Sequence, residues 1–257
     1  MTTTAGHQSK RADGLREVAE GVYRLGTKWL NFYLVEEDGE FTLIDAGYAG
    51  YWRHLTEAVD ALGTSLEAIR AVILTHHHVD HVGTAQRLHS TVGARVFVGE
   101  GDLWIVAGKY KSHANPGFYR QASLRPSGVR FIAHSAAAGG GKYRPVAGVE
   151  ALQEDQPLDL PGRPRVIFTP GHSGGHHSVV LEERGVLFSG DAMASFDYVT
   201  GTRGIGLHRL NDDRAIALAS LARLDPIDAE IVLFGHGDPW TGGLRQALEI
   251  ARGTAQE

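Results

Sequence analysis

Short apolar runs recur along the chain between turns that contain Gly, Pro or Asp, and this pattern predicts a protein built on buried β-strands. The run AVILT, for example, is apolar and largely β-branched, as expected for a strand that is covered on both faces. Asp38-Gly39 separates two such runs and is typical of a hairpin turn. We expect strands at residues 22–26, 32–37, 41–47, 71–75, 94–99, 165–171, 177–183, 185–191 and 231–237.

Amphipathic stretches between these runs predict helices. Leu55, Val59 and Leu62 recur at helical spacing, which indicates a helix over 51–62. Strand clusters flanked by such stretches occur in both halves of the chain, and this arrangement is typical of an α/β fold whose sheets are covered by helices. We expect further helices at 80–90, 212–224 and 241–252.

The pattern predicts one domain with one irregular segment. Residues 1–14 are small and polar, and we expect a disordered N-terminal tail there. Residues 15–257 contain no repeat or linker and are expected to form a single domain. Within it, the stretch at about 100–150 lacks the strand–turn pattern and mixes aromatic residues with Gly, Pro and basic residues. We therefore interpret 100–150 as an aromatic insert.

Composition narrows the classes of function. The chain has 25 Lys and Arg against 30 Asp and Glu, a formal net charge of −5, which argues against a nucleic-acid partner. It has no cysteine, which excludes disulfides, thiolate metal sites and a cysteine nucleophile. No apolar run approaches the ~18 residues of a membrane span, and no apolar signal stretch is present, so we expect a cytoplasmic protein without a membrane partner.

The 14 histidines are the feature that points to chemistry, and the densest group follows the strand at 71–75. His76, His78, Asp80 and His81 form the pattern H-x-H-x-D-H. Side chains at i and i+2 of an extended segment point the same way, so His76 and His78 can share a ligand. Asp80 is suited to begin the next helix, which turns His81 in another direction. Imidazole and carboxylate donors without thiolate suit zinc, iron or manganese.

Three more candidates come directly after expected buried strands. His172 follows VIFTPG, Asp191 follows VLFSG and His236 follows IVLFG. Strand ends that meet at one edge of a sheet are where ligand-binding residues collect. The H-x-H-x-D-H cluster alone could bind one metal ion with an open position, or supply half of each of two sites. With the three further residues, the donors suffice for two ions.

The other histidines lack this positional support. We expect the His77 side chain to point away from those of its neighbours. We expect His176 or His177 to hold a metal-ligating residue in place without binding the metal itself. Surface or loop positions are expected for His7, His54, His89, His113, His134 and His208.

Taken in order, the motifs resemble those of the metallo-β-lactamase superfamily over about residues 18–250. They are LIDAG with Asp45, THHHVDH, TPGH with His172, FSGD with Asp191 and FGHG with His236. The resemblance implies a four-layer αββα sandwich with metal ions at one edge. Asp45 would brace the ligand loop, as carboxylates behind ligating histidines do. The implied ligands are His76, His78 and His172 for one ion, Asp80, His81 and His236 for the other, and Asp191 as a bridge.

The same resemblance implies a zinc-dependent hydrolase with two divalent ions, with iron or manganese as other possible metals. A hydroxide that bridges the ions would attack an ester-type bond, and Asp80 would orient it. True zinc β-lactamases usually lack a bridging aspartate, so Asp191 favours glyoxalase II-like thioesterases, lactonases or phosphodiesterases. We expect a small-molecule thioester or lactone as substrate, with a phosphodiester as the alternative. The oligomeric state is left open.

Two alternatives of different chemistry stay open. Mono-iron persulfide dioxygenases resemble this fold, and a lone iron would fit His76, His172 and Asp191, although the other three ligands would then be unnecessary. The stretch 171–175 fits the G-x-S-x-G of serine hydrolases. That motif needs a helix after the serine, whereas HHSVVLEE alternates as a strand does.

The aromatic insert is expected to cover the metals and to provide an apolar pocket for the substrate. Quorum-lactone hydrolases place a tyrosine shortly after the bridging aspartate, and Tyr198 lies seven residues after Asp191. The alternative is that the aromatic residues of the insert form their own small core. The residues expected to line the pocket are Trp29, Trp104, Phe196 and Tyr198, with Tyr110, Phe118 and Tyr119 beside them.

Overall fold

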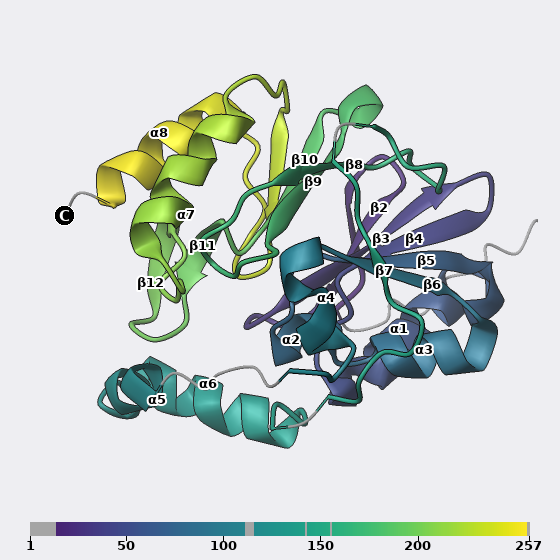
Figure 1. The fold of residues 1–257 in the computed structure, drawn as a ribbon, viewed down its shortest axis with the longest axis horizontal. Helices are drawn as coiled ribbons and strands as arrows, with labels where there is room; N and C mark the ends of the chain where they lie inside the picture. Colours follow the sequence, from purple (N-terminus) through teal and green to yellow (C-terminus); the bar gives the residue numbers. More distant parts are fainter. Residues whose placement is uncertain (1–13, 111–115, 142, 155, 256–257) are drawn as a thin grey trace, which may run out of the picture.

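The computed structural model describes residues 14–110, 116–141, 143–154 and 156–255 (Figure 1). The expected disordered tail at 1–14 lies outside these ranges except for Gly14. None of the described helices is long and apolar enough to span a membrane.

Two sheets form the centre of the molecule. In the larger sheet, the last four strands pair in parallel, while the strands before them form antiparallel hairpins. Its strands, in spatial order, are β1 (Arg16–Ala19), β2 (Val22–Gly26), β3 (Asn31–Glu37), β4 (Glu40–Ile44), β5 (Ile69–Leu74), β6 (Arg95–Val98) and β7 (Glu150–Ala151). The smaller sheet has the order β13 (Ile231–Phe234), β10 (Val186–Gly190), β9 (His177–Leu181) and β8 (Arg165–Phe168).

Helices cover the outer face of each sheet (Figure 1). The larger sheet is covered by α1 (Trp52–Ala61), α2 (Val79–Val82), α3 (Ala85–Val92) and α4 (Glu100–Val106). The smaller sheet is covered by α7 (Arg214–Ser220) and α8 (Leu244–Thr254), and the hairpin of β11 (Met193–Asp197) and β12 (Thr202–Leu207) packs beside them. Short 3-10 turns occur at Ala49–Tyr51, Leu66–Ala68, Glu182–Arg184 and Leu221–Leu224.

Alternating side chains of the strands explain the layers. On β5, Val72 packs toward the covering helices, while Ile73 faces the other sheet. On β13, Leu233 faces the first sheet and Phe234 packs toward α8. Because neighbouring residues of a strand point to opposite faces, an apolar run is buried on both sides, as the sequence pattern indicated. The layer order is helix, sheet, sheet, helix, which confirms the predicted αββα sandwich.

The prediction of one helix over 80–90 was wrong in one respect, because two helices, α2 and α3, occupy this stretch. They are separated at Gly83, whose amide donates to the Gly47 carbonyl. A Cβ at Gly83 would lie 2.2 Å from the Tyr48 carbonyl carbon, so this close approach of two backbones requires glycine. The tertiary contact interrupts a stretch that is otherwise helical in its pattern.

The segment 100–150 is more regular than the sequence suggested. Besides α4 it contains α5 (Pro116–Ser123) and α6 (Pro126–Ala137), which lie together across one end of the sandwich (Figure 1). This pair is joined to the rest of the molecule by a small buried cluster of mainly aromatic residues. The cluster consists of Trp29, Ala122, Phe131, Phe196, Tyr198 and Val199.

Candidate metal centre

Polar side chains that follow β4, β5, β8, β10 and β13 meet at one edge of the sandwich. β10 and β13 are parallel, and β9 is antiparallel to both β8 and β10, so β8, β10 and β13 end on the same side. All seven residues that the sequence predicted as ligands lie at this edge, in groups whose donor atoms are within 4.8 Å of one another. The groups are His76, His78 and His172; His76, His81 and Asp191; and Asp80, His81 and His236.

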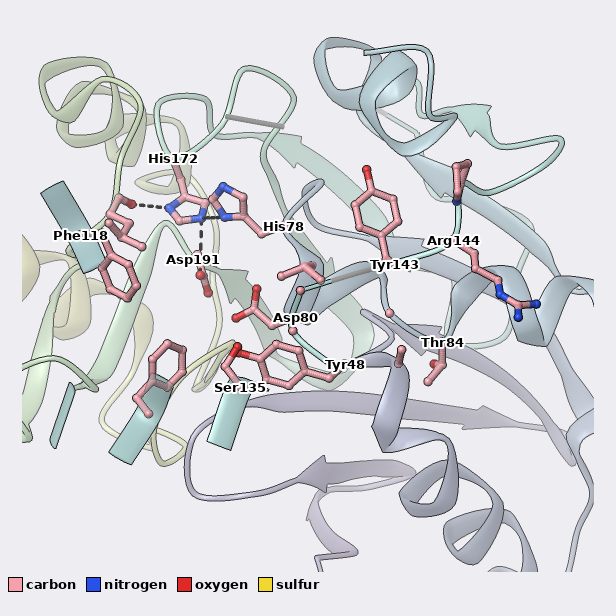
Figure 2. A pocket seen from close by; sticks show the side chains of 18 of the residues that line it. Tyr48, His78, Asp80, Thr84, Phe118, Ser135, Tyr143, Arg144, His172 and Asp191 are labelled. Carbon is pink, nitrogen blue, oxygen red and sulfur yellow. Dashed lines mark hydrogen bonds and ion pairs between the residues drawn. The ribbon is translucent and has the colours of Figure 1, made fainter. Parts of the chain in front are cut away.

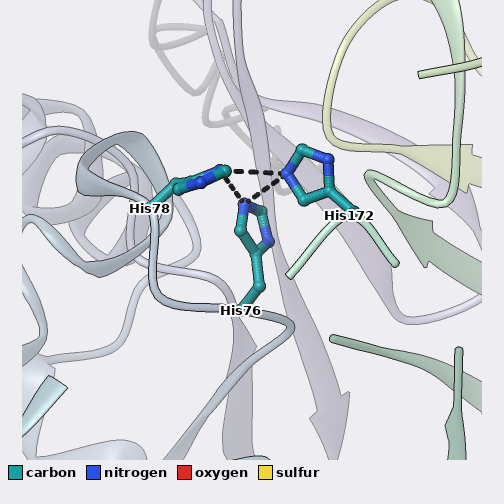
Figure 3. Close-up of side chains that lie close together, drawn as sticks. All are labelled: His76, His78 and His172. Atoms are coloured by element: carbon teal, nitrogen blue, oxygen red, sulfur yellow. Dashed lines mark hydrogen bonds between the residues drawn. The ribbon is translucent and has the colours of Figure 1, made fainter. Parts of the chain in front are cut away.

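The first group is a triangle of imidazole nitrogens (Figure 3). His76 Nε2 lies 3.0 Å from His78 Nδ1, and His172 Nε2 lies 3.1 Å from the former and 2.9 Å from the latter. Burial lowers the pKa of all three rings, that of His78 to about 3, so they are neutral at physiological pH. The spacing of His76 and His78 on an extended segment brings their nitrogens together, as the sequence pattern predicted.

Hydrogen bonds behind two of these rings determine which nitrogen faces inward with a lone pair. The Thr75 hydroxyl lies 3.0 Å from Asp45 and from His76 Nδ1. Since it donates to the carboxylate, it accepts from Nδ1 of His76. His172 Nδ1 donates to the Leu210 carbonyl. The Nε2 atoms of His76 and His172 therefore carry no proton, and their lone pairs point into one shared space. This arrangement suits a metal ion.

The second group, Asp80, His81 and His236, is anchored in the same way. His81 Nδ1 donates to Asp45 Oδ2 over 2.8 Å, and His236 Nδ1 donates to the Trp29 carbonyl. His236 Nε2 lies 3.6 Å from Asp80 Oδ2. Asp80 does not cap the helix as expected; α2 begins at Val79 with His78 as the N-cap residue, and Asp80 is in its first turn.

Asp45 occupies the bracing position that the resemblance implied. Besides His81, its carboxylate accepts from the Thr75 amide over 2.8 Å. Its φ of 59° is in the left-handed region, which is costly for a residue with a side chain. The strained backbone thus brings one carboxylate against both ends of the segment 75–81, at Thr75 and at His81.

Asp191 lies at the centre of the two groups. Its Oδ2 is 3.3 Å from His236 Nε2, 3.5 Å from His172 Nε2 and 3.6 Å from His81 Nε2. Burial would raise its pKa, but the surrounding imidazoles outweigh burial and hold it well below the usual value. Its amide donates to His176 Nε2 over 3.0 Å, which gives His176 the supporting role considered from the sequence.

The second group attracts positive charge. Burial disfavours a charged His81, but the carboxylates of Asp45, Asp191 and Asp80 outweigh burial and raise its pKa well above the usual value. The pKa of His236 is raised against the effect of burial too, chiefly by Asp191. A divalent cation would meet the same demand and displace these protons.

A second observation also indicates that these donor atoms fit a metal ion. Four polar atoms here are buried without a hydrogen-bond partner among the described residues: Nε2 of His81, His208 and His236, and Oδ1 of Asp191. Buried polar atoms normally have hydrogen-bond partners. Several unpartnered nitrogen and oxygen atoms around one point therefore suit the binding of a metal ion. Gly235 supports close packing here, because a Cβ on it would lie 2.3 Å from Asp191 Oδ1.

From the sequence, two residues of this region were not identified as part of the site. His208, expected at the surface or in a loop, is 2 % exposed, and its Nε2 lies 3.4 Å from Asp191 Oδ2. His208 follows β12, a strand that contains glycine and lacks the buried apolar run that preceded the other candidate residues.

The other missed residue is Asp102 of α4, which is 1 % exposed. Its carboxylate accepts from the His77 amide over 3.0 Å, the Ser173 hydroxyl over 2.6 Å and the Gly175 amide over 2.9 Å. The segments that carry His76, His78 and His172 are thus tied together by one carboxylate of the aromatic insert. Burial would raise its pKa, but the His77 imidazole, whose Nδ1 lies 3.2 Å from Asp102 Oδ1, together with the Ser173 hydroxyl and the Gly175 amide, holds it at about 2. No sequence motif marks a single Asp in this role.

A pocket of about 1200 Å³ opens onto the cluster (Figure 2). His78, His172 and Asp191 are at one end, and Tyr143 and Arg144 are at the other. Seven Phe and Tyr residues contribute to the walls of the pocket. The aromatic lining residues are Tyr48, Tyr110, Phe118, Tyr119, Phe131, Tyr143 and Tyr198.

The expected lining needs correction at three of its positions. Trp104 is not part of this lining; its ring is 47 % exposed, with Lys109 Nζ 4.0 Å from its centroid. Trp29 and Phe196 are buried behind the wall in the aromatic cluster, with ring centroids 5.9 Å apart. Tyr198 is in the lining and stacks on Phe131 at a centroid distance of 4.0 Å.

The geometry excludes the serine hydrolase alternative. Ser173 is fully buried and donates to Asp102 rather than to a histidine. The segment after it leads into strand β9, not into the helix that a nucleophile elbow requires.

Comparison with known proteins gives one family and several relatives. The family model described as the metallo-beta-lactamase superfamily matches residues 30–236. The chain is 28% identical over 240 residues to the Bacillus subtilis (strain 168) protein named "Probable metallo-hydrolase YflN", with 88% of this chain and 87% of the relative covered. It is 25% identical over 209 residues to the "Atrochrysone carboxyl ACP thioesterase" of Aspergillus fumigatus, covering 80% of this chain but 50% of that protein.

A solved structure agrees with the fold. The crystal structure of the metallo-beta-lactamase family protein TTHA1429 from Thermus thermophilus superposes with a TM-score of 0.68 at 26% sequence identity. The match covers 93% of this chain and 81% of that one.

Proposed function

The chain belongs to the metallo-beta-lactamase superfamily, and we propose that it is a dinuclear metal-dependent hydrolase that cleaves an ester-type bond of a small molecule. The observation that carries the proposal is the group of inward-facing nitrogens and carboxylate oxygens at the end of a large pocket with seven Phe and Tyr residues in its walls. A histidine-rich cluster that only stabilised the fold would not need to open onto such a pocket.

Zinc is the ion we propose, because imidazole and carboxylate donors in compact groups suit it. One ion would be held by His76, His78 and His172. The other would be held by Asp80, His81 and His236, with Asp191 between them. When bound, such ions supply Lewis acidity and lower the pKa of water, so that a nucleophile is available near neutral pH.

The residues of the chain would position the reacting groups. Asp80 is 14 % exposed in its side chain and lines the pocket, where its carboxylate would accept a hydrogen bond from the attacking water and orient it. Burial, reinforced by the charges of Asp80 and Asp191, raises the pKa of Tyr198 well above its usual value. Tyr198 therefore keeps its proton and would donate it in a hydrogen bond to the substrate carbonyl.

We propose a thioester rather than a lactone as the substrate. Arg87 and Arg144 line the pocket; the Arg87 guanidinium packs over the Trp52 ring at 4.1 Å, and no ion pair of either arginine is found among the described residues. Arg144 lies at the far end from the metal-binding cluster (Figure 2). The carriers of biological thioesters bear phosphate or carboxylate groups, which these guanidinium groups would attract. The relative named as a thioesterase supports the same substrate class.

The mono-iron alternative is less well supported. A lone iron at His76, His172 and Asp191 would leave Asp80, His81 and His236 without a role, although these three donors lie within 4.8 Å of one another. A phosphodiester remains the alternative substrate class for the dinuclear site, and a phosphodiester probe is therefore part of the test.

The test is hydrolysis of three probes by the purified protein before chelation, after chelation and after zinc is restored. The probes are an acyl-coenzyme A, a γ-lactone and bis(p-nitrophenyl) phosphate. We expect thioester cleavage that is lost on chelation and recovered with zinc. Cleavage that survives complete metal removal would contradict the proposal, and preferential cleavage of the phosphate would replace the proposed substrate class.

A further inference from the structure

His208 is a buried histidine at the metal-binding cluster that lies outside the seven-residue ligand pattern. It follows β12 and is 2 % exposed. Its ring lies at right angles to His172, with centroids 4.7 Å apart, and is roughly parallel to that of His236 at 5.4 Å. The residue therefore lies between the two proposed ion sites.

The ring of His208 is oriented by the same backbone group that orients His172. His208 Nδ1 lies 3.1 Å from the Leu210 carbonyl, which also accepts from His172 Nδ1. The Leu210 amide donates to the same nitrogen over 3.2 Å, so Nδ1 has a backbone partner in either tautomer of the ring. In the tautomer that carries its proton on Nδ1, as His172 does, the Nε2 lone pair of His208 faces the cluster.

That Nε2 atom has no adequate partner among the described residues. It is buried without a hydrogen bond, and the oxygen Oδ2 of Asp191 is 3.4 Å away. This separation exceeds a normal N–H···O hydrogen bond. It is close to the distance of about 3.3 Å between two ligands of one ion with bonds of about 2.0–2.1 Å in tetrahedral geometry. His172 Nε2, at 3.5 Å from the same oxygen, shows a similar spacing.

We propose that His208 is an additional metal ligand, which joins His172 and Asp191 at the metal centre through Nε2. The three donor atoms lie within 4.8 Å of one another. The inference rests on the proposed metal centre but not on its substrate. An eighth donor would give one ion a higher coordination number, so that the site holds its metal more tightly.

The test compares His208→Gln with His89→Gln, measured as metal binding rather than as activity. His89 is a matched control, because its Nδ1 also bonds a backbone carbonyl, that of Ala94 at 2.9 Å, on helix α3. Each metal-free protein is titrated with zinc against a chromophoric chelator, and then with cobalt, whose visible absorption reports the coordination number. We expect His208→Gln to bind one of two ions at least about 10-fold more weakly and to change the cobalt spectrum. His89→Gln should behave as the wild type does.

Affinities and spectra of His208→Gln identical to the wild type would overturn the inference. If the variant does not fold, ¹⁵N NMR of the wild-type histidines replaces it. Zinc should then shift the His208 Nε2 resonance as it shifts that of His172, and an unshifted His208 resonance would refute the ligand role. A protein that binds two ions but cleaves no thioester would contradict only the proposed substrate.

Discussion

The ligand-bearing segments and the helices α5 and α6 face the same pocket but are held in very different ways. The predicted ligands of the first region lie shortly after buried strands or, for Asp80 and His81, in the short helix α2 that follows β5, and several are fixed by a hydrogen bond behind them, as His81 is by Asp45. In contrast, the second region is attached by a small, mainly aromatic cluster and a few hydrogen bonds, such as the one of 2.6 Å between the Tyr51 hydroxyl and His134 Nε2, and it leaves Tyr119 52 % and Leu124 78 % exposed. We call the first region the rigid edge and the second the wall; the proposed ions would be held by the rigid edge, and the proposed substrate would contact the more weakly packed wall.

Because the two regions are held differently, substitutions in them should affect two different properties, metal binding and the use of substrates. A change at the rigid edge should alter metal binding and therefore all activity. A change in the wall should alter the use of substrates and leave the metal content intact. Substitutions in each region test this separation.

The largest effect is expected for His78→Ala. Its nitrogen is one corner of the imidazole triangle, so its removal should lower activity by about 10³-fold or more and reduce the bound metal. The fold should persist, because His78 is only partly buried. Elemental analysis, steady-state kinetics and circular dichroism measure the three properties. Full turnover by this variant would show that the assigned site is wrong, whereas His89→Ala should leave all three unchanged.

Asp102→Asn should weaken metal binding by about 10- to 100-fold, the usual cost of losing a group that orients ligands. The amide can accept fewer hydrogen bonds from Ser173 and the Gly175 amide, which position the segment of His172. A chelator competition assay measures the affinity. An unchanged affinity would mean that the aromatic insert does not contribute to the rigid edge.

The same carboxylate predicts a pH dependence of stability. Its pKa is about 2 in the folded protein against an ordinary value of 3.8, so the unfolded state binds more protons between these limits. The stabilisation, about 2 kcal/mol, is therefore present above about pH 4 and lost as the pH falls toward 2. Denaturant unfolding of the metal-free protein should show the advantage of wild type over Asp102→Asn shrinking across this window. A constant difference would contradict the ionised, hydrogen-bonded state of Asp102.

In the wall, Phe131→Ala should lower kcat/KM by about 10-fold without changing the metal content. Phe131 is 6 % exposed and stacks on Tyr198, so its loss leaves a cavity behind a pocket residue. The control is Leu124→Ala, in the same segment but exposed. Loss of metal from Phe131→Ala would show that the two regions are not independent.

The smallest effect is expected for Arg144→Ala. An exposed guanidinium contributes about 1 kcal/mol or less to binding, so KM for an acyl-coenzyme A should rise by roughly 3-fold. A neutral thioester without phosphate should show no change, and Arg130→Ala, on α6 outside the pocket lining, should affect neither substrate. Equal effects of Arg144→Ala on both thioesters would exclude a charge-based role.

The rigid edge is also the region that the sequence predicted best. Strand, glycine and then His or Asp is a local pattern, and the parallel strand ends bring the marked residues together whatever the loops do. The roles of Asp102 and His208 were not predictable in this way. Each depends on a segment that reaches the cluster only in the folded molecule, Asp102 from α4 and His208 from the end of β12.

The wall was predicted least well for the same physical reason. Aromatic residues in the insert show no strong periodicity, so their division into lining residues, such as Phe118, and exposed residues, such as Trp104, follows from tertiary packing. The break between α2 and α3 has a similar origin, because it arises from packing of Gly83 against residues 47–49, and no local pattern contains that contact.

The central claim is that this edge of the sandwich holds two metal ions, and anomalous diffraction from a crystal of the zinc-loaded protein tests it most directly. We predict two peaks at the zinc edge, about 3.5–4 Å apart. One should lie among His76, His78 and His172, and the other among Asp80, His81 and His236. A single peak near His76, His172 and Asp191, with the second group empty at saturating zinc, would contradict the account.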